Sequence, residues 1–111
     1  MTEITTCTFC DIVAHLLPST QHFEDEDVLV INNILGWTPV MLLVLPKQHM
    51  NQQQLWSTPI IAKIGRVAVD MGELHCPDGY RIISNFGYNA MQSQRHGHIH
   101  VLGGTHLGQY A

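Results

Sequence analysis

The chain has 111 residues, 45% of them hydrophobic and 13% charged, which excludes intrinsic disorder and provides the core of one domain but not of two. We therefore expect a single domain over residues 1–111. Nine acidic side chains outnumber five basic ones, and the net charge of −4 argues against binding to a nucleic-acid backbone. Histidine is the unusual residue, because its eight copies outnumber lysine and arginine together.

Cysteine content and targeting signals indicate the compartment. Three cysteines, Cys7, Cys10 and Cys76, cannot form a disulfide framework without leaving one over. The N-terminus lacks the cationic stretch and apolar run of a secretory signal. The longest apolar run, residues 40–45, is far shorter than the roughly 20 residues that span a bilayer. We expect a cytoplasmic protein that does not associate with membranes.

The first predicted elements are a short helix and three strands. The helix covers residues 10–17, with Asp11 in its first turn and Pro18 at its end. The acidic run at residues 24–27 is predicted to be a solvated turn. A continuous apolar run is typical of a central strand that is covered on both faces. The three strands are predicted at residues 22–25, 28–32 and 40–45.

One long helix is predicted with Ser57 or Thr58 as N-cap and Pro59 as its first residue. Apolar residues follow at spacings of three and four, which places Ile60, Ile64, Val67, Met71 and Leu74 on one face. Residues 76–79 end this helix, and strands follow at 80–85 and 96–102 around a loop. Five strands and two helices without regular alternation favour an α+β fold with an antiparallel sheet over a parallel doubly wound one.

Three histidines recur at every second position near the C-terminus: His96, His98 and His100. On a strand they share one face at steps of about 6.7 Å. One metal ion held by all three is strained, because the outer two backbones are about 13 Å apart. Two neighbours could share an ion, and a solvated sheet face is the structural alternative. We favour separate roles as nucleophile, orienting partner and structural ligand, because imidazole is largely neutral and nucleophilic near pH 7.

A family resemblance covers nearly the whole chain at the right spacings. Residues 85–104, NFGYNAMQSQRHGHIHVLGG, resemble the signature of the histidine triad (HIT) family of nucleotide-binding hydrolases and transferases. Residues 45–49 resemble its upstream Pro-Lys-x-His element, and residues 7–18 resemble its usual opening. The resemblance implies a homodimer of α+β subunits, each with a five-stranded antiparallel sheet that binds a nucleoside phosphate.

The resemblance also implies roles for single residues. His98 matches the nucleophile, which attacks the α-phosphorus of a nucleoside 5′-phosphoramidate or related nucleotide and forms a nucleotidyl-histidine that water hydrolyses. His96 and Ser93 are its expected catalytic partners near the phosphate and the leaving group. A purine nucleotide such as AMP is the expected ligand, held by neutral donors suited to an acidic chain. The nucleotide-binding residues are expected to be Asn85, Gln92, Ser93, His98 and Asn33.

The pair Cys7 and Cys10 has a zinc interpretation, a redox interpretation and a structural one. A thioredoxin-like redox motif needs a βαβ context, which is missing here. Zinc needs two further ligands, and the sequence offers His49 and His100. Some HIT proteins carry such a Cys-Cys-His-His site, with the second histidine taken from the end of the triad. We expect a closed structural zinc site, with two free buried cysteines as the alternative.

Several positions depart from the family pattern. Asn32 and Asn33 stand where an acidic residue is usual for the ribose hydroxyls, Met41 replaces a histidine, and Gly97 replaces an apolar spacer. These departures affect the expected base and leaving group rather than the triad chemistry. A dinucleoside polyphosphate hydrolase is the alternative within this class. A nucleotide-binding sensor with incidental activity and a zinc-stabilised structural protein are alternatives from other classes.

Overall fold

The computed structural model describes residues 6–109. Within them, no helix is both long and apolar enough to cross a bilayer. The elements in chain order are α1 (Thr8–Val13), β1 (Gln21–Glu24), β2 (Val28–Asn32), β3 (Val40–Pro46), α2 (Gln52–Ser57), α3 (Ile60–His75), β4 (Tyr80–Ile83), the 3-10 helix η1 (Tyr88–Ala90) and β5 (Ile99–Gly103).

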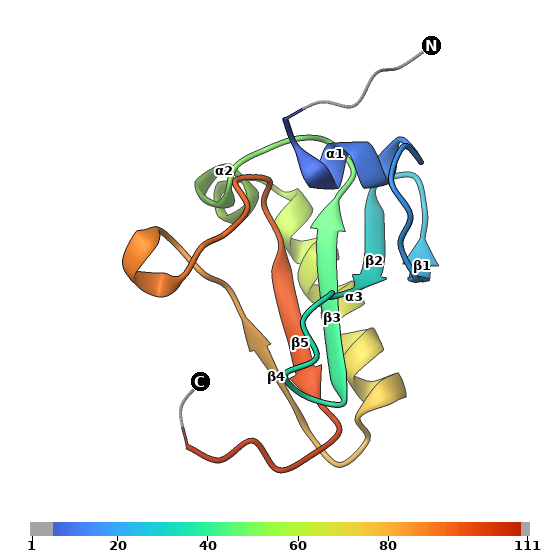
Figure 1. Cartoon of the computed structure of the whole chain (residues 1–111), viewed down its shortest axis with the longest axis vertical. Coiled ribbons are helices and arrows are strands. Elements are labelled where there is room, and N and C mark those ends of the chain that lie inside the picture. The colour runs from blue at the N-terminus through green and yellow to red at the C-terminus, as the bar shows by residue number, and fades with distance from the viewer. Residues whose placement is uncertain (1–5, 110–111) are drawn as a thin grey trace.

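The strands form one antiparallel sheet in the order β1-β2-β3-β5-β4 (Figure 1). The predicted α+β fold with a five-stranded antiparallel sheet is therefore confirmed. The continuous apolar run of β3 lies at the centre, paired with β2 on one side and β5 on the other. Such a run suits a strand that is buried on both faces.

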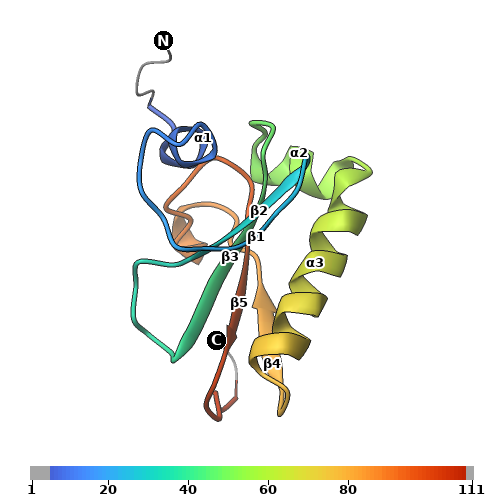
Figure 2. The same cartoon turned by 90° about the vertical axis from the view of Figure 1, so that its right-hand side faces the viewer.

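Each face of the sheet is covered by a different helix (Figure 2). Alternate side chains of a strand point to opposite faces, so Val28 and Val30 pack in the core beneath α3. Leu29 and Ile31 join a second core on the other face, which contains Phe9 of α1. The α3 face is closed by a long helix, whereas the α1 face is covered only at one end and leaves room for a cleft.

The described residues contain three α-helices where two were predicted. The additional helix is α2, which begins at Gln52 and is capped by Asn51 through a capping box with Gln54. Ser57 and Thr58, the expected N-caps of the long helix, bond back to α2 instead. Their hydroxyls donate to the carbonyls of Gln53 and Gln54, at 2.6 and 2.9 Å. The N-cap of α3 is consequently Pro59, without a side-chain cap.

Two further expectations about helices need correction. The first helix begins at Thr8 rather than residue 10, because the sulfur of Cys7 accepts the N–H of Cys10 and caps it. It ends early at Val13, before the left-handed turn of His15 (φ 61°). In α3 the buried face departs from the predicted apolar face in the last turns. Gly72 is buried there, whereas Leu74, which was predicted on that face, is 68% exposed.

Candidate metal centre and active-site cleft

The three alternating histidines do not all lie in a strand. β5 begins at Ile99, so His96 and His98 precede it and only His100 is part of the ladder. His98 and His100 still share a face, with their ring centroids 5.2 Å apart, and both line the cleft on the α1 side of the sheet. His96 is completely buried and is not among the residues lining that cleft. The three histidines therefore divide into a pair at the cleft, His98 and His100, and a separate buried residue, His96.

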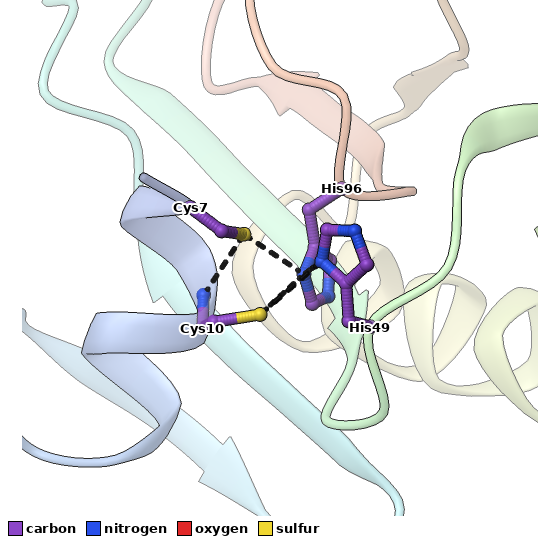
Figure 3. A group of neighbouring side chains, drawn as sticks. All are labelled: Cys7, Cys10, His49 and His96. Carbon is purple, nitrogen blue, oxygen red and sulfur yellow. Dashed lines mark hydrogen bonds between the residues drawn. The ribbon is translucent and has the colours of Figure 1, made fainter. Parts of the chain in front are cut away.

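The ring of His96 is directed at the N-terminal cysteines (Figure 3). Its Nε2–H donates to the carbonyl of Pro46 at 2.7 Å, which places the proton on Nε2 and the free lone pair on Nδ1. Burial lowers the pKa of His96 to about 4, so the ring is neutral. The Nδ1 lone pair lies 3.4 Å from the sulfurs of both Cys7 and Cys10. This is the tautomer that a metal ligand requires.

Four donor atoms converge at this point: the sulfurs of Cys7 and Cys10 and the Nδ1 atoms of His49 and His96, all within 4.8 Å of one another. His49 Nδ1 lies 3.2 Å from Cys10 Sγ and 3.2 Å from His96 Nδ1. With Zn–S of about 2.3 Å and Zn–N of about 2.0–2.1 Å, tetrahedral zinc separates its ligand atoms by roughly 3.3–3.8 Å.

The donor set and its spacing fit a closed structural zinc site. The Cys10 N–H donates to Cys7 Sγ at 3.3 Å, a bond that stabilises a thiolate. The second ring nitrogen of His96, Nε2, donates to the carbonyl of Pro46. Zinc-bound histidines generally donate from their second ring nitrogen to such an acceptor. The prediction of structural zinc is confirmed, with all four ligands provided by the described part of this chain.

The structure corrects two assignments within the triad. The fourth zinc ligand is His96 and not His100, because the chain turns before β5 and directs the first ring toward α1. His96 was also expected beside the phosphate as a catalytic partner. With Nε2 bonded to Pro46 and Nδ1 at the cysteines, neither ring nitrogen of His96 faces the cleft. His100 faces the cleft instead, in the position of a second imidazole beside His98.

A cleft of about 1370 Å³ lies on the α1 face. Its floor holds His98 and His100, and α1 contributes Phe9 as one wall. Phe9 packs edge-on against His98, with ring centroids 5.1 Å apart, and against His96 at 5.8 Å. Exposed apolar side chains form part of the rim, among them Trp37 after β2 and Met91 after η1.

His98 is held in one tautomer. It is 2% exposed, and its Nδ1–H donates to the carbonyl of His96 at 2.8 Å, which leaves the Nε2 lone pair free. Burial lowers the pKa of His98, and burial together with His98 lowers the pKa of His100 to about 4. Both rings are therefore neutral near pH 7. A neutral, fixed imidazole with one free nitrogen is suited to nucleophilic attack.

The predicted nucleotide-binding residues are found in different settings. Asn33, Asn85 and Ser93 line the cleft, from the β2–β3 loop and the loop before β5. Asn33 Oδ1 accepts the N–H of Leu35, and Asn85 Nδ2 donates to Ala90 O at 2.8 Å.

Gln92 is not among the residues that line the cleft, and its side chain makes hydrogen bonds within its own loop. Its Oε1 accepts the N–H of Gly87 at 2.8 Å, and its Nε2 donates to Gln94 O at 3.0 Å. Both ends of the Gln92 amide thus bond within the loop, and the expected contact between Gln92 and the nucleotide stays a prediction.

Two residues at the site carry little signal in the sequence. Gln52 is completely buried and bonded to the backbone of His98, although it belongs to a polar run that reads as surface. Phe9 reads as an ordinary core residue, yet it contacts the rings of both His96 and His98. The unusual number of glutamines after His49 was the one available hint, and it does not indicate which of them faces inward.

The fold and site together define a class: a small α+β protein whose first helix is held by a Cys2His2 centre and whose cleft is floored by neutral imidazoles. Residues 15–107 match the model of the HIT domain. The chain belongs to the HIT family.

Solved structures share this fold, and a curated relative has a related sequence. A HIT family hydrolase from Clostridium thermocellum is 35% identical with a TM-score of 0.88, over 97% of this chain and 98% of that one. A zinc-bound histidine triad family protein from Mycobacterium smegmatis is 32% identical with a TM-score of 0.74, over 96% and 80%. An uncharacterised HIT-like protein of Chlamydia muridarum is 36% identical over 80% of this chain and 74% of its own.

Proposed function

We propose that the chain is a hydrolase that attacks the α-phosphorus of a nucleoside 5′-phosphoramidate or a related nucleotide through His98. The observation that carries this proposal is the state of His98, whose Nδ1–H is bonded to a carbonyl and whose free Nε2 lies at the floor of a large cleft. Membership of the HIT family and similarity to a HIT family hydrolase support the reaction class.

In the first step, the Nε2 lone pair of His98 bonds to the α-phosphorus while the bond to the leaving nitrogen breaks. The amine leaves with a proton, and the hydroxyl of Ser93, which lines the cleft, is its proposed donor. The substituted imidazole becomes cationic, and its Nδ1–H remains bonded to His96 O. Water then attacks the phosphorus and gives a proton back to the Ser93 oxygen while the bond between phosphorus and His98 Nε2 breaks. This step releases the nucleoside monophosphate and restores both side chains.

The phosphate is proposed to be held without cationic side chains. The described residues that line the cleft include no lysine or arginine. Asn85 and Ser93, which line the cleft from the loop before β5, are the proposed neutral donors, and Asn33 of the β2–β3 loop is proposed to contact the ribose. Fixed dipoles directed at developing charge stabilise it strongly, so we propose that neutral donors suffice. We propose a purine nucleotide such as AMP as ligand or product.

Replacing His98 with alanine tests the mechanism. The His98→Ala variant is expected to lose turnover of an adenosine 5′-phosphoramidate by at least about 10³-fold, because the covalent route is removed. AMP binding, measured by calorimetry, should persist, and mass spectrometry of the wild-type protein should detect an adduct on His98. Wild-type turnover by His98→Ala would overturn the mechanism.

The alternative activities are separated by substrate. A dinucleoside polyphosphate hydrolase would show the higher kcat/KM on diadenosine polyphosphates and would release AMP together with a second nucleotide. A sensor module would bind AMP at micromolar concentration without turnover of either substrate. The phosphoramidate is favoured here because apolar rim residues such as Trp37 and Met91 suit an organic leaving group better than a second polyphosphate.

We also propose that the chain forms a homodimer in a reducing, cytoplasmic setting. β4 is an edge strand, and exposed apolar side chains gather on it and its neighbours: Trp56, Val69 and Ile82. Two antiparallel β4 edges can pair about a twofold axis. Light scattering should give twice the chain mass, and Ile82→Lys should shift it toward the monomer. A monomeric wild-type protein at micromolar concentration would contradict the dimer.

A further inference from the structure

Gln52 is a buried polar side chain that joins two distant segments of the backbone. It is completely inaccessible to solvent. Its Oε1 accepts the backbone N–H of His98 at 2.9 Å, and its Nε2 donates to the backbone carbonyl of Asn85 at 3.1 Å. One amide thus connects the residue proposed as nucleophile to the loop that carries the neutral donors.

Neither bonded segment is held by the sheet at these points. The ladder of β5 begins at Ile99, one residue after His98, and β4 ends at Ile83, two residues before Asn85. Without Gln52, the buried N–H of His98 would lose its partner, at a cost that protein interiors rarely tolerate. Gln52 therefore holds the backbone of His98 and Asn85 in place just beyond the ends of the two strands.

The helix that carries Gln52 is pressed closely against the same segment. Gly97 N–H donates to the carbonyl of Met50 at 2.6 Å. A Cβ atom on Gly97 would lie 3.0 Å from Leu55 and 3.1 Å from the carbonyl oxygen of Asn51. The absence of a side chain at residue 97 thus lets the start of α2 approach the triad closely enough for Gln52 to reach His98.

We infer that Gln52 is a positioning residue for the reaction proposed above, on which this inference rests. It is not among the residues lining the cleft, so it acts through His98 and Asn85. It fixes the distance between the attacking Nε2 and the donors that bind the phosphate. Displacement of a reacting group by about 1 Å can cost on the order of 10²-fold in rate.

The test compares two glutamines of one helix in the full-length, zinc-loaded protein. Gln52→Met keeps the side-chain length and removes both hydrogen bonds, and we expect kcat on the adenosine phosphoramidate to fall by about 10- to 100-fold. KM should change less than about threefold, because the cleft lining is unaltered. Gln53→Met makes the same replacement at an exposed position of α2 and should keep the wild-type kcat.

Two further variants separate positioning from stability. Gln52→Glu keeps an acceptor for the His98 N–H, so its kcat should lie between those of wild type and Gln52→Met. Gly72→Ala places a Cβ 2.4 Å from the ring of Tyr80, between α3 and β4, and should lower the melting temperature without lowering kcat in the folded protein. Zinc content and melting temperature are measured for every variant.

The outcomes distinguish the two proposals. If neither wild type nor Gln53→Met turns over any nucleotide tested, the proposed function is overturned, and the positioning role with it. If both turn over and folded Gln52→Met retains the wild-type kcat, only the positioning role is overturned. If Gln52→Met does not fold, a wild-type kcat in Gln52→Glu overturns the role, and a reduced kcat with unchanged KM supports it.

Discussion

At the scale of single residues, His96 and His98 are two positions apart and serve different centres. One ring is directed at the cysteines of α1 and the other at the cleft, and they are connected by the bond from His98 Nδ1–H to His96 O. The carbonyl of a zinc ligand therefore fixes the tautomer of the residue proposed as nucleophile. Hydrogen bonds to the residues that hold a metal commonly fix the orientation of the side chains around it.

Zinc content separates the two candidate ligands of the triad. His96→Ala removes one of the four convergent donors, so purified protein should contain less than about half an equivalent of zinc, compared with one in wild type. His100→Ala, which alters a ring on the cleft, should retain a full equivalent. Emission spectrometry of protein purified without chelator measures both. Zinc loss confined to His100→Ala would contradict the assignment.

A charged turn between β1 and β2 makes stability depend on pH. Asp25 accepts the N–H groups of Asp27 and Val28 and pairs with Lys63 at 2.8 Å. The Lys63 ammonium and these N–H groups lower the pKa of Asp25 to about 2. A lowered pKa in the folded state stabilises the fold above the unfolded value of about 3.9 and loses that effect as the pH falls toward 2.

Asp25→Asn should therefore reduce the free energy of unfolding at pH 5 to 7, and the difference from wild type should shrink below about pH 4. Urea titrations at several pH values measure this difference. Glu26→Gln changes an exposed acid of the same turn, outside the Lys63 pairs, and is the control. A difference for Asp25→Asn that grows as the pH falls would exclude this explanation.

At the scale of elements, the sequence predicted β2 at its observed bounds and placed every strand of the sheet. Hydrophobic patterning determines such elements, because burial on one or both faces selects the residues directly. α2 was missed because its run of glutamines has no apolar stripe, and its stability comes from the Asn51 capping box and the buried Leu55. Ser57 and Thr58 resemble N-caps but bond backward, a choice that tertiary contacts decide.

The site was predicted only in part, because tertiary contacts decide which residues meet there. The zinc ligands Cys7, Cys10 and His49 follow from residue type, whereas the fourth depends on where β5 begins. The ends of an element are the least reliable part of a sequence-based prediction. The last strand was predicted to begin at residue 96 but begins at Ile99, and the assignment of the fourth zinc ligand changes from His100 to His96 with it. Local spacing can propose a set of ligands, but it cannot show where the chain turns.

Two glycines test the close packing of α2 against the triad segment. Gly97→Ala should lower the free energy of unfolding by about 1–3 kcal/mol, because a Cβ meets Leu55 at 3.0 Å and Asn51 O at 3.1 Å. Gly65→Ala is the matched control in α3, where an added Cβ would meet no atom within 4 Å outside its own stretch of helix, and should raise stability by about 0.5–1 kcal/mol. Urea denaturation measures both. Equal effects would show that the segment can move away freely.

At the scale of the whole molecule, the zinc centre connects parts that lie far apart in sequence. Cys7 caps α1 and Cys10 lies in it, His49 comes from the segment after β3, and His96 comes from the segment before β5 (Figure 3). α1 also contributes Phe9, Thr8 and Ile12 to the cleft lining. The metal thus fixes one wall of the cleft, although it takes no part in the proposed chemistry.

Removal of zinc should therefore affect both stability and ligand binding. Chelation is expected to lower the free energy of unfolding by about 4 kcal/mol or more when zinc had been held a thousandfold above its Kd. Hydrogen exchange should increase in residues 8–13 before it does in β3, and AMP affinity should fall as Phe9 loses its support. Readdition of zinc should restore both. Unchanged AMP binding in the metal-free protein would separate the cleft from the metal.

The absence of lysine and arginine from the described cleft lining has a consequence for the conditions in which the protein works. Attraction between full charges is screened over about 8 Å at physiological ionic strength, whereas short hydrogen bonds from neutral groups in a sheltered cleft are screened much less. The affinity for the proposed nucleotide should accordingly change little between low and high salt. Selection among anions would then depend on shape and donor geometry rather than on net charge.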